Sequence, residues 1–287
     1  NMSIHYDNVL WIATDNDGII IIDTKKETLK KRINRKNGLA ISHIRKSILY
    51  RQSNVWIATS GGGFYKYFQN NFIHYDQNSG LKNNRVYAVH SSNNDIWASN
   101  SDSGLVKIDS LGIVHHIPLE ESLPEIKIKT ITSDERGNIW AGTDGKGILF
   151  KERIQVDSII MDTNYTKKKR IELIPIDTIT KTVYKSHVIN NNKGLPSDWI
   201  RSIKVINNTV WAASYSAGIC RFTYDTKRKR IKALKKFTLK NGLTDLQIRD
   251  MKQDPNGKVW YVTQNGHIGY IHKNKVTHLG NILKQKT

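Results

Sequence analysis

One recurrent position in the sequence gathers cationic side chains. It lies six residues after a leucine that recurs along the chain, an apolar residue precedes it each time, and its occupants are Arg45, Tyr87, Lys129, Arg201 and Arg249. Because side chains alternate between the two faces of a strand, the apolar residue should enter the core and leave the next one free. Arginine binds a carboxylate or a sulfate through two parallel hydrogen bonds. We expect an anion-binding ring at this position; the alternative is that each cation pairs with an acid of a neighbouring repeat.

A seventh tryptophan stands apart from the six that mark the repeats. Trp199 ends the segment Gly194-Leu195-Pro196-Ser197-Asp198-Trp199, which has the composition of a loop. The flat indole can stack on a ligand, and packing against a neighbouring loop is the alternative. The candidate ligand-binding residues are therefore Arg45, Tyr87, Lys129, Trp199, Arg201 and Arg249.

Two short phrases repeat along the chain and set the spacing of these residues. The first phrase joins an apolar residue to a tryptophan and then to small or β-branched residues, and its tryptophans are Trp11, Trp56, Trp97, Trp140, Trp211 and Trp260. The second phrase is Gly-Leu, worn to Ser122-Leu123-Pro124 in one repeat. Its leucine precedes the next tryptophan by 17, 16, 17, 16 and 17 residues, so the chain contains a structural repeat of about 43 residues.

Each repeat holds short runs of β-branched and aromatic residues separated by Gly, Asn and Asp, with almost no helical periodicity. About 43 residues accommodate four strands of roughly five residues, which is one blade of a β-propeller. We name the strands A (after Gly-Leu), B (with the tryptophan), C (after the next Gly turn) and D. The sequence predicts an all-β fold, a single β-propeller domain over residues 1–287, with six four-stranded blades, or seven if one blade is missing from the chain.

One repeat is longer than the rest. Trp140 and Trp211 lie 71 residues apart, which leaves about 28 residues beyond one blade. This surplus is too short for another blade, so we expect it to lengthen the hairpin between strands C and D of blade 4, over about 152–182, with its tip at 164–170. In this topology the Gly-Leu loops and the B–C turns share one end of the disc, where a ligand is expected.

The charge balance is strongly basic, since 45 Lys and Arg against 25 Asp and Glu give a net charge of +20. Segments 24–36, 166–185 and 225–240 carry most of the excess, and all three fall on C–D hairpins with strand D at the outer edge of a blade. Lysines on an edge strand prevent edge-to-edge aggregation. The alternative is a basic flank that lies on an anionic membrane or polysaccharide surface. Cations spread over separate blade edges do not form a nucleic-acid groove, so nucleic acid is not an expected partner.

The sequence lacks the patterns of common catalytic and metal sites. No Gly-rich phosphate loop, zinc-protease His pair or nucleophile elbow occurs. Asp15-Asn16-Asp17-Gly18 begins like a calcium loop but lacks the closing glutamate, so we expect a B–C turn there. We expect no catalytic residue, no metal and no cofactor. The single Cys220 excludes an internal disulfide, and no apolar run is long enough to span a membrane.

The repeat reads Gly-Leu, then an Ile-Arg pair, then Asp-x-x-Gly-Lys/Asn-Val/Ile-Trp, then Thr and a Gly turn. It resembles the two-component regulator propeller repeat over residues 3–280, most closely over 125–147 and 241–266. In that family such propellers are extracytoplasmic sensors of hybrid histidine kinases that detect polysaccharide fragments. The resemblance implies a periplasmic or cell-surface location, an oligosaccharide ligand, which the cationic ring would make anionic, and contact with the remaining domains of a full-length protein. This chain departs from the family in its six repeats, where family sensors usually carry two seven-bladed rings, and in its basic charge.

A non-enzymatic sensor propeller is therefore the function that we expect. One alternative is a cell-surface or secretion-associated binding module. The other, from a weaker resemblance to streptogramin-lyase propellers, is a propeller lyase, although the catalytic His and metal-binding acid of those enzymes have no assignable positions here.

Overall fold

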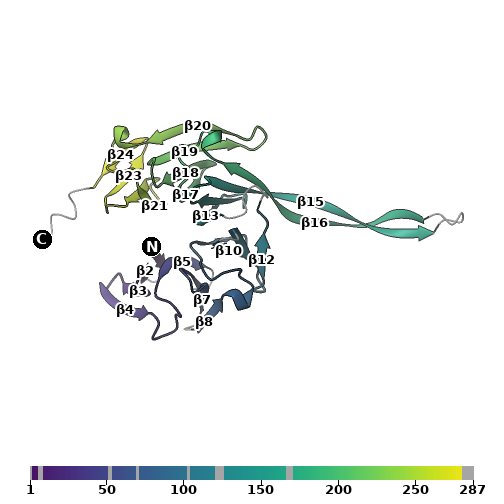
Figure 1. Ribbon diagram of the computed structural model, residues 1–287, viewed down its shortest axis with the longest axis horizontal. Coiled ribbons are helices and arrows are strands. Elements are labelled where there is room, and N and C mark those ends of the chain that lie inside the picture. The colour runs from purple at the N-terminus through teal and green to yellow at the C-terminus, as the bar shows by residue number, and fades with distance from the viewer. Residues whose placement is uncertain are drawn as a thin grey trace.

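The computed structural model describes residues 2–5, 9–50, 54–68, 71–101, 104–119, 126–165 and 171–279. Its strands form six sheets of four consecutive antiparallel strands, and Figure 1 shows these blades following one another around a disc. The prediction of an all-β, six-bladed propeller is confirmed, and the described residues contain no seventh blade. None of the described segments is a helix that is long and apolar enough to cross a membrane.

The first three blades occupy the N-terminal part of the chain. Blade 1 contains β1 (Met2–His5), β2 (Val9–Ala13), β3 (Ile19–Asp23) and β4 (Thr28–Ile33). Blade 2 contains β5 (Ile44–Tyr50), β6 (Asn54–Thr59), β7 (Phe64–Phe68) and β8 (Asn71–Tyr75). Blade 3 contains β9 (Val89–Ser92), β10 (Asp95–Asn100), β11 (Gly104–Ile108) and β12 (Val114–Ile117).

The last three blades complete the disc. Blade 4 contains β13 (Ile128–Ser133), β14 (Ile139–Thr143), β15 (Ile148–Tyr165) and β16 (Ile171–Ile189). Blade 5 contains β17 (Ile200–Ile206), β18 (Thr209–Ser214), β19 (Ile219–Asp225) and β20 (Arg230–Phe237). Blade 6 contains β21 (Ile248–Gln253), β22 (Val259–Thr263), β23 (Ile268–His272) and β24 (Lys275–His278).

The Gly-Leu phrase is a turn that leads into each strand A. In three loops it follows a short 3-10 turn, η1 (Gln77–Ser79), η2 (Asn191–Lys193) or η3 (Leu239–Asn241). The glycine after each turn adopts a left-handed conformation with φ between 90° and 99°, which a glycine adopts without steric cost. The leucine that follows is buried in every described case. The worn copy, Ser122-Leu123-Pro124, lies outside the described residues.

The B–C turn after a tryptophan strand is closed by a hydrogen bond and contains a glycine. In blade 4 the hydroxyl of Thr143 donates to the carbonyl of Gly147 at 2.8 Å, and the same bond closes the turns of blades 1 and 2. Gly147 has φ of 77°, and a Cβ there would lie 2.2 Å from the carbonyl oxygen of Ile189. The turn therefore requires both the threonine and the glycine that recur in the sequence.

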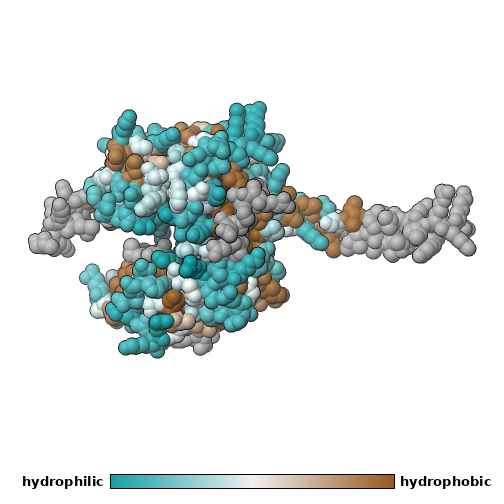
Figure 2. Space-filling model, in the orientation of Figure 1, coloured by the Kyte–Doolittle hydropathy of each residue, from teal (hydrophilic) through white to brown (hydrophobic). Residues whose placement is uncertain are grey.

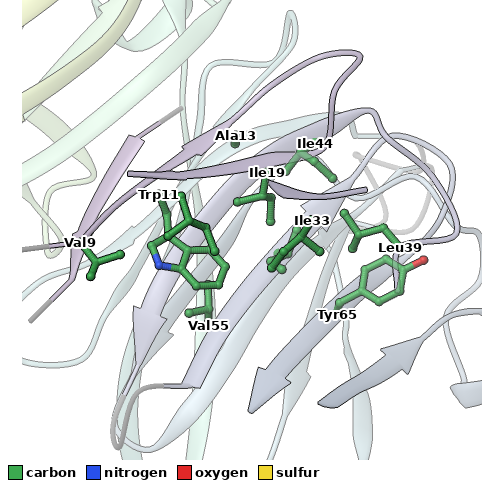
Figure 3. Packing of buried hydrophobic residues seen from close by; sticks show 11 residues of the cluster. Val9, Trp11, Ala13, Ile19, Ile33, Leu39, Ile44, Val55 and Tyr65 are labelled. Carbon is green, nitrogen blue, oxygen red and sulfur yellow. The ribbon is translucent and has the colours of Figure 1, made fainter. Parts of the chain in front are cut away.

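Hydrophobic clusters join consecutive blades. Trp11 of blade 1 belongs to one buried cluster with Val55, Ile57 and Tyr65 of blade 2. Figure 3 shows Trp11 beside Val55 and Tyr65 beside Leu39. Trp56, Trp97, Trp140 and Trp211 are likewise buried, each in the cluster shared with the next blade. The interpretation of these tryptophans as packing residues is confirmed, because the stack of blades is the core of the molecule.

The boundary between blades 6 and 1 differs from the other five. In blade 6, Trp260 of β22 and Tyr270 of β23 are partly exposed. In blade 1, Leu10 and Ile12 of β2 are partly exposed as well. Among the described residues, none of the buried clusters joins these two blades. Blades 1 and 6 thus each have one apolar face that is only half-buried.

Strands C and D of blade 4 are much longer than those of the other blades. β15 pairs with β16 from Ile148↔Ile189 to Tyr165↔Ile171, with one irregularity after Ile160, and Figure 1 shows the hairpin extending away from the disc. Exposed apolar residues occur along its proximal part, where Figure 2 shows a brown patch. Residues 166–170, which include most of the expected tip, lie outside the described part of the chain.

Candidate functional site

One end of the disc is built from two kinds of loop. The B–C turn of each of four blades donates a glycine N–H to the D–A loop of the following blade, in the pairs Gly18–Ser42, Gly63–Asn84, Gly147–Asp198 and Gly218–Leu246. These bonds place the B–C turns and the Gly-Leu loops at the same end, as the topology predicts. We call this end the rim.

The cationic position lies at the rim, on a β-bulge, which simple alternation of side chains along a strand does not predict. In four blades the register of strand A shifts across this residue, so Arg45, Lys129, Arg201 and Arg249 are each the extra residue of a β-bulge. The residue before the bulge and the residue two positions after it both enter the blade stack, as Ile200 and Ile203 do. The intervening residue, such as Ser202, then faces the channel. Spacing of the buried residues by three rather than two is the sequence signal for this bulge.

Members of the ring in blades 3 to 6 contact one another through residues of the B–C turns. Lys129 Nζ lies 3.8 Å from the ring centroid of Tyr87 and 3.6 Å from Asp144 Oδ2. Asp144 Oδ1 lies 2.9 Å from the guanidinium of Arg201. We call this connected set, which continues through Tyr215 to Arg249, the rim arc.

Tyr215 joins the last two cations of the rim arc. Its ring centroid lies 5.0 Å from the guanidinium carbon of Arg201 and 6.0 Å from that of Arg249, within the range of cation–π attraction. No described carboxylate forms an ion pair with Arg249. Three cations and one carboxylate give the arc an excess of positive charge, and Arg249 is its exposed end.

Arg45 lies apart from the rim arc. Its guanidinium is 3.3 Å from Asp15 Oδ1 of blade 1 and 3.3 Å from Ser60 Oγ. Asp15 and Asp144 occupy the same position, directly after the threonine that ends the tryptophan phrase. The local pairing with a neighbouring blade, one of the two interpretations of the ring, is therefore present for Arg45 and Arg201. The acid after this threonine could have been found in the sequence, but only by comparing the repeats residue by residue.

Trp199 is 48 % exposed and lies beside the rim arc. Its backbone forms a bridge with Asp144, and its carbonyl accepts the N–H of Tyr215 at 2.9 Å. A Cβ on Gly145 would lie 3.4 Å from the indole, so one face of the ring covers this turn. The structure thus shows both loop packing and an exposed surface for the same side chain.

An open pocket of about 470 Å³ adjoins the rim arc between blades 5 and 6. Its lining residues come from the B–C turns and the Gly-Leu loop, and they are Tyr215, Ser216, Leu239, Thr244, Asp245, Leu246, Gln247 and Asn265. Asn265 Nδ2 donates to Asp245 Oδ2 at 2.9 Å, which fixes two of the polar groups. An aromatic ring, apolar side chains and several hydrogen-bonding groups are the composition of a pocket for a small polar ligand. The cationic position alone did not predict this pocket.

The three basic segments reach the outer edges of their blades. Strands β4, β16 and β20 are the last strands of their sheets, and lysines of β4 and β20 are exposed. Blade 1 is separated from blades 4 and 5 around the disc, so these cations do not form one continuous patch. Asp15, Asn16 and Asp17 form an exposed turn, and no described group of His, Cys, Asp and Glu is arranged to hold a metal ion.

Comparison with known proteins identifies the fold. No family model matches the sequence, and no curated protein is significantly similar to it. The structure is similar to the extracellular domain of a hybrid two-component system from B. thetaiotaomicron, with a TM-score of 0.64, 17 % identity and coverage of 92 % of this chain and 32 % of that one. It is also similar to a catalytically inactive virginiamycin B lyase from Staphylococcus aureus solved with quinupristin, with a TM-score of 0.66, 13 % identity and coverage of 96 % and 82 %.

A WD40 domain of Neurospora crassa Pan2 has the same fold, with a TM-score of 0.59, 12 % identity and coverage of 97 % of this chain and 77 % of that one. The chain spans about a third of the B. thetaiotaomicron domain. Solved structures that share this fold thus include the extracellular domain of a hybrid two-component system. At these identities the similarity concerns the fold, and this chain is a β-propeller.

Proposed function

We propose that this chain is a non-enzymatic, ligand-binding propeller that works outside the cytoplasm as the sensor part of a hybrid two-component regulator. Two independent observations support the proposal. The repeat resembles the two-component regulator propeller repeat along most of the chain, and the fold is similar to an extracellular domain of such a system. In this role the remaining domains of the longer protein are partners of the propeller.

The ligand site that the geometry favours is the pocket between blades 5 and 6 together with the end of the rim arc. The observation that carries this proposal is the position of Tyr215, which lines the pocket and also contacts the guanidinium groups of Arg201 and Arg249. An oligosaccharide in the pocket would meet hydroxyl-binding groups such as Gln247 and Asn265. A carboxylate or sulfate on the same molecule would reach Arg249, with the exposed face of Trp199 nearby.

Calorimetry with oligosaccharides tests this proposal. We expect uronic-acid or sulfated oligosaccharides to bind more tightly than neutral ones of the same length. The double variant Arg201→Ala/Arg249→Ala should bind more weakly by about a hundredfold or more, because two charge-assisted hydrogen bonds of about 1.5–3 kcal/mol each are lost. The matched control is Arg228→Ala/Arg230→Ala, on the exposed outer edge of blade 5, which removes the same charge and should bind as wild type does. Tighter binding of neutral sugars, or unchanged binding by the double variant, would overturn the assignment of the rim arc.

A surface-binding module is the second candidate, favoured by exposed lysines on β4 and β20. Vesicles of anionic lipid, or an immobilised acidic polysaccharide, would then retain wild type but not a variant in which the cations of 225–240 are replaced by glutamine. Retention that is equal for both proteins contradicts this candidate and leaves the sensor proposal untouched.

A further inference from the structure

The centre of the disc contains charged side chains that the rim arc does not use. Beyond each bulge, alternate residues of strand A face the channel, because their neighbours Ser47, Ile203 and Met251 are buried in the blade stack. The channel-facing residues of blades 2, 3, 5 and 6 include Lys46, His90, Ser202, Lys204 and Asp250.

These groups act on one another across the channel. Burial and then the charge of Lys204 lower the pKa of Lys46 to about 8, while Asp250 raises it. Burial, Lys46 and Lys204 together lower the pKa of His90 to about 3, so this imidazole is neutral at pH 7. The first strands of consecutive blades contact one another around the centre of the disc, and β5 and β17 lie on opposite sides of that centre (Figure 1). Lys46 of β5 and Lys204 of β17, both partly exposed, therefore approach the channel from opposite sides.

The described residues do not balance this positive charge. Asp250 Oδ1 accepts the Ser202 hydroxyl at 2.8 Å and the Met251 N–H at 2.8 Å. Neither Lys46 nor Lys204 forms an ion pair with a described carboxylate. Two ammonium groups held near one another in a partly buried space are unfavourable unless an anion compensates them.

Solvent reaches this part of the channel from one side. Asp250 and Lys252 of blade 6 are exposed, whereas Thr130 and Thr132 on the channel side of blade 4 are buried. The exposed side coincides with the boundary between blades 6 and 1, where no described cluster joins the blades. Lys46 and Lys204 are themselves partly exposed, so water reaches both side chains.

We propose that the central channel binds a single oxyanion, a carboxylate, phosphate or sulfate group, between Lys46 and Lys204. Charge-assisted hydrogen bonds from the two ammonium groups hold the anion. Neutral His90, whose Nε2 lies 2.9 Å from Ser133 Oγ, forms one wall of the site. This site is separate from the rim arc and does not depend on the proposed oligosaccharide.

Calorimetric titration of the full chain with sodium sulfate, sodium phosphate and sodium acetate at pH 7 and constant ionic strength tests the channel site. We expect one anion per molecule for at least one of the three salts. The variant Lys46→Gln/Lys204→Gln should bind at least tenfold more weakly, and Lys46→Arg, which keeps the charge, should retain binding. The matched control is Arg228→Gln/Arg230→Gln on the exposed outer edge of blade 5, which removes the same charge and should leave sulfate binding unchanged. The rim variant Arg201→Gln/Arg249→Gln should keep the binding that depends on Lys46 and Lys204.

Two results overturn the channel site. One is the absence of binding for all three anions in wild type, and the other is binding that survives the channel double variant and disappears in the rim variant. Circular dichroism of each variant establishes that it is folded before its titration is interpreted. Because the rim variant separates the two sites, failure of the channel site and failure of the oligosaccharide proposal give different results.

Discussion

Arg201 of blade 5 and Asp144 of blade 4 form an ion pair of 2.9 Å across a blade boundary, with only 17 % and 18 % of their side chains exposed. The equivalent pair, Arg45 with Asp15, is longer at 3.3 Å and has 40 % and 68 % exposed. One sequence position therefore gives two ion pairs in different solvent environments, because the pair at blades 4 and 5 is covered by the adjoining loops.

A double-mutant cycle distinguishes the two pairs. We expect Arg201→Met and Asp144→Asn to show a coupling free energy of about 1–2 kcal/mol, since both groups are largely removed from water. Arg45→Met and Asp15→Asn should couple by less than about 0.5 kcal/mol, as exposed pairs do. The measurement is urea denaturation of the single and double variants. Equal coupling in the two cycles would show that burial does not decide the strength of these pairs.

Gly147 should tolerate substitution much less well than Gly194. Both glycines have positive φ, but a Cβ at Gly147 would lie 2.2 Å from the carbonyl oxygen of Ile189, whereas nothing lies within 4 Å of one at Gly194. Gly194→Ala should cost about 1–2 kcal/mol, the price of the left-handed conformation alone. Gly147→Ala adds a backbone clash and should cost several kcal/mol more. Denaturant midpoints of both variants measure the difference, and similar midpoints would contradict the role of the close approach.

Repetition made the blades predictable from the sequence. Each Trp and each Gly-Leu phrase marks a strand or a turn that has a local cause. The Thr143–Gly147 bond of blade 4, for example, has equivalents in blades 1, 2 and 5. Strict alternation of side chains along strand A does not predict the bulge, although the three-residue spacing from Ile200 to Ile203 carries its signal. The pocket at Tyr215 and the approach of Lys46 to Lys204 depend on how separate blades are oriented, and no local pattern encodes that.

The half-buried boundary between blades 6 and 1 leads to a comparison of two tryptophans. Trp140 and Trp260 each donate an indole N–H to the aspartate six residues earlier, at 3.1 and 2.9 Å, so alanine removes the same hydrogen bond from both. Trp140 is buried against blade 5, and Trp140→Ala should cost about 3–5 kcal/mol. Trp260→Ala should cost less than half as much, because less apolar area is lost from the interior. A thermal melt in which both variants lose the same stability would show that the boundary is packed in solution.

The long hairpin should be removable if the cut spares its base. His187 is buried and its Nε2 forms a hydrogen bond with Glu152 Oε2 at 2.8 Å, and Tyr184 packs edge-on against Trp97. Replacing 156–181 by a four-residue turn keeps these contacts and should shift Tm by only a few degrees. Replacing 152–182 also removes Glu152 and should lower Tm further, because a buried polar group loses its partner. Identical melting temperatures for the two deletions would show that the Glu152–His187 pair does not stabilise the blade.

Lys46 gives a pH dependence with a definite sign. Its pKa is about 8 in the folded chain against an ordinary value of 10.5, so between these two values the unfolded chain binds more protons and stability rises with pH. The groups that face Lys46 are Lys204, which lowers its pKa, Asp250, which raises it, and His90, which is uncharged throughout this range.

Lys46→Met removes the titration, so its gain in stability over wild type should be largest below pH 8 and should vanish by about pH 10.5. The control Lys236→Met removes the same charge from the exposed edge of blade 5, so it separates the loss of one cation from the titration of Lys46. Urea denaturation from pH 6 to 10.5 in sodium chloride gives both curves, and adding sulfate should move the wild-type transition to higher pH, because an anion beside Lys46 favours its charged form. A gain for Lys46→Met that is constant over this range would show that the ammonium group is fully hydrated in the channel.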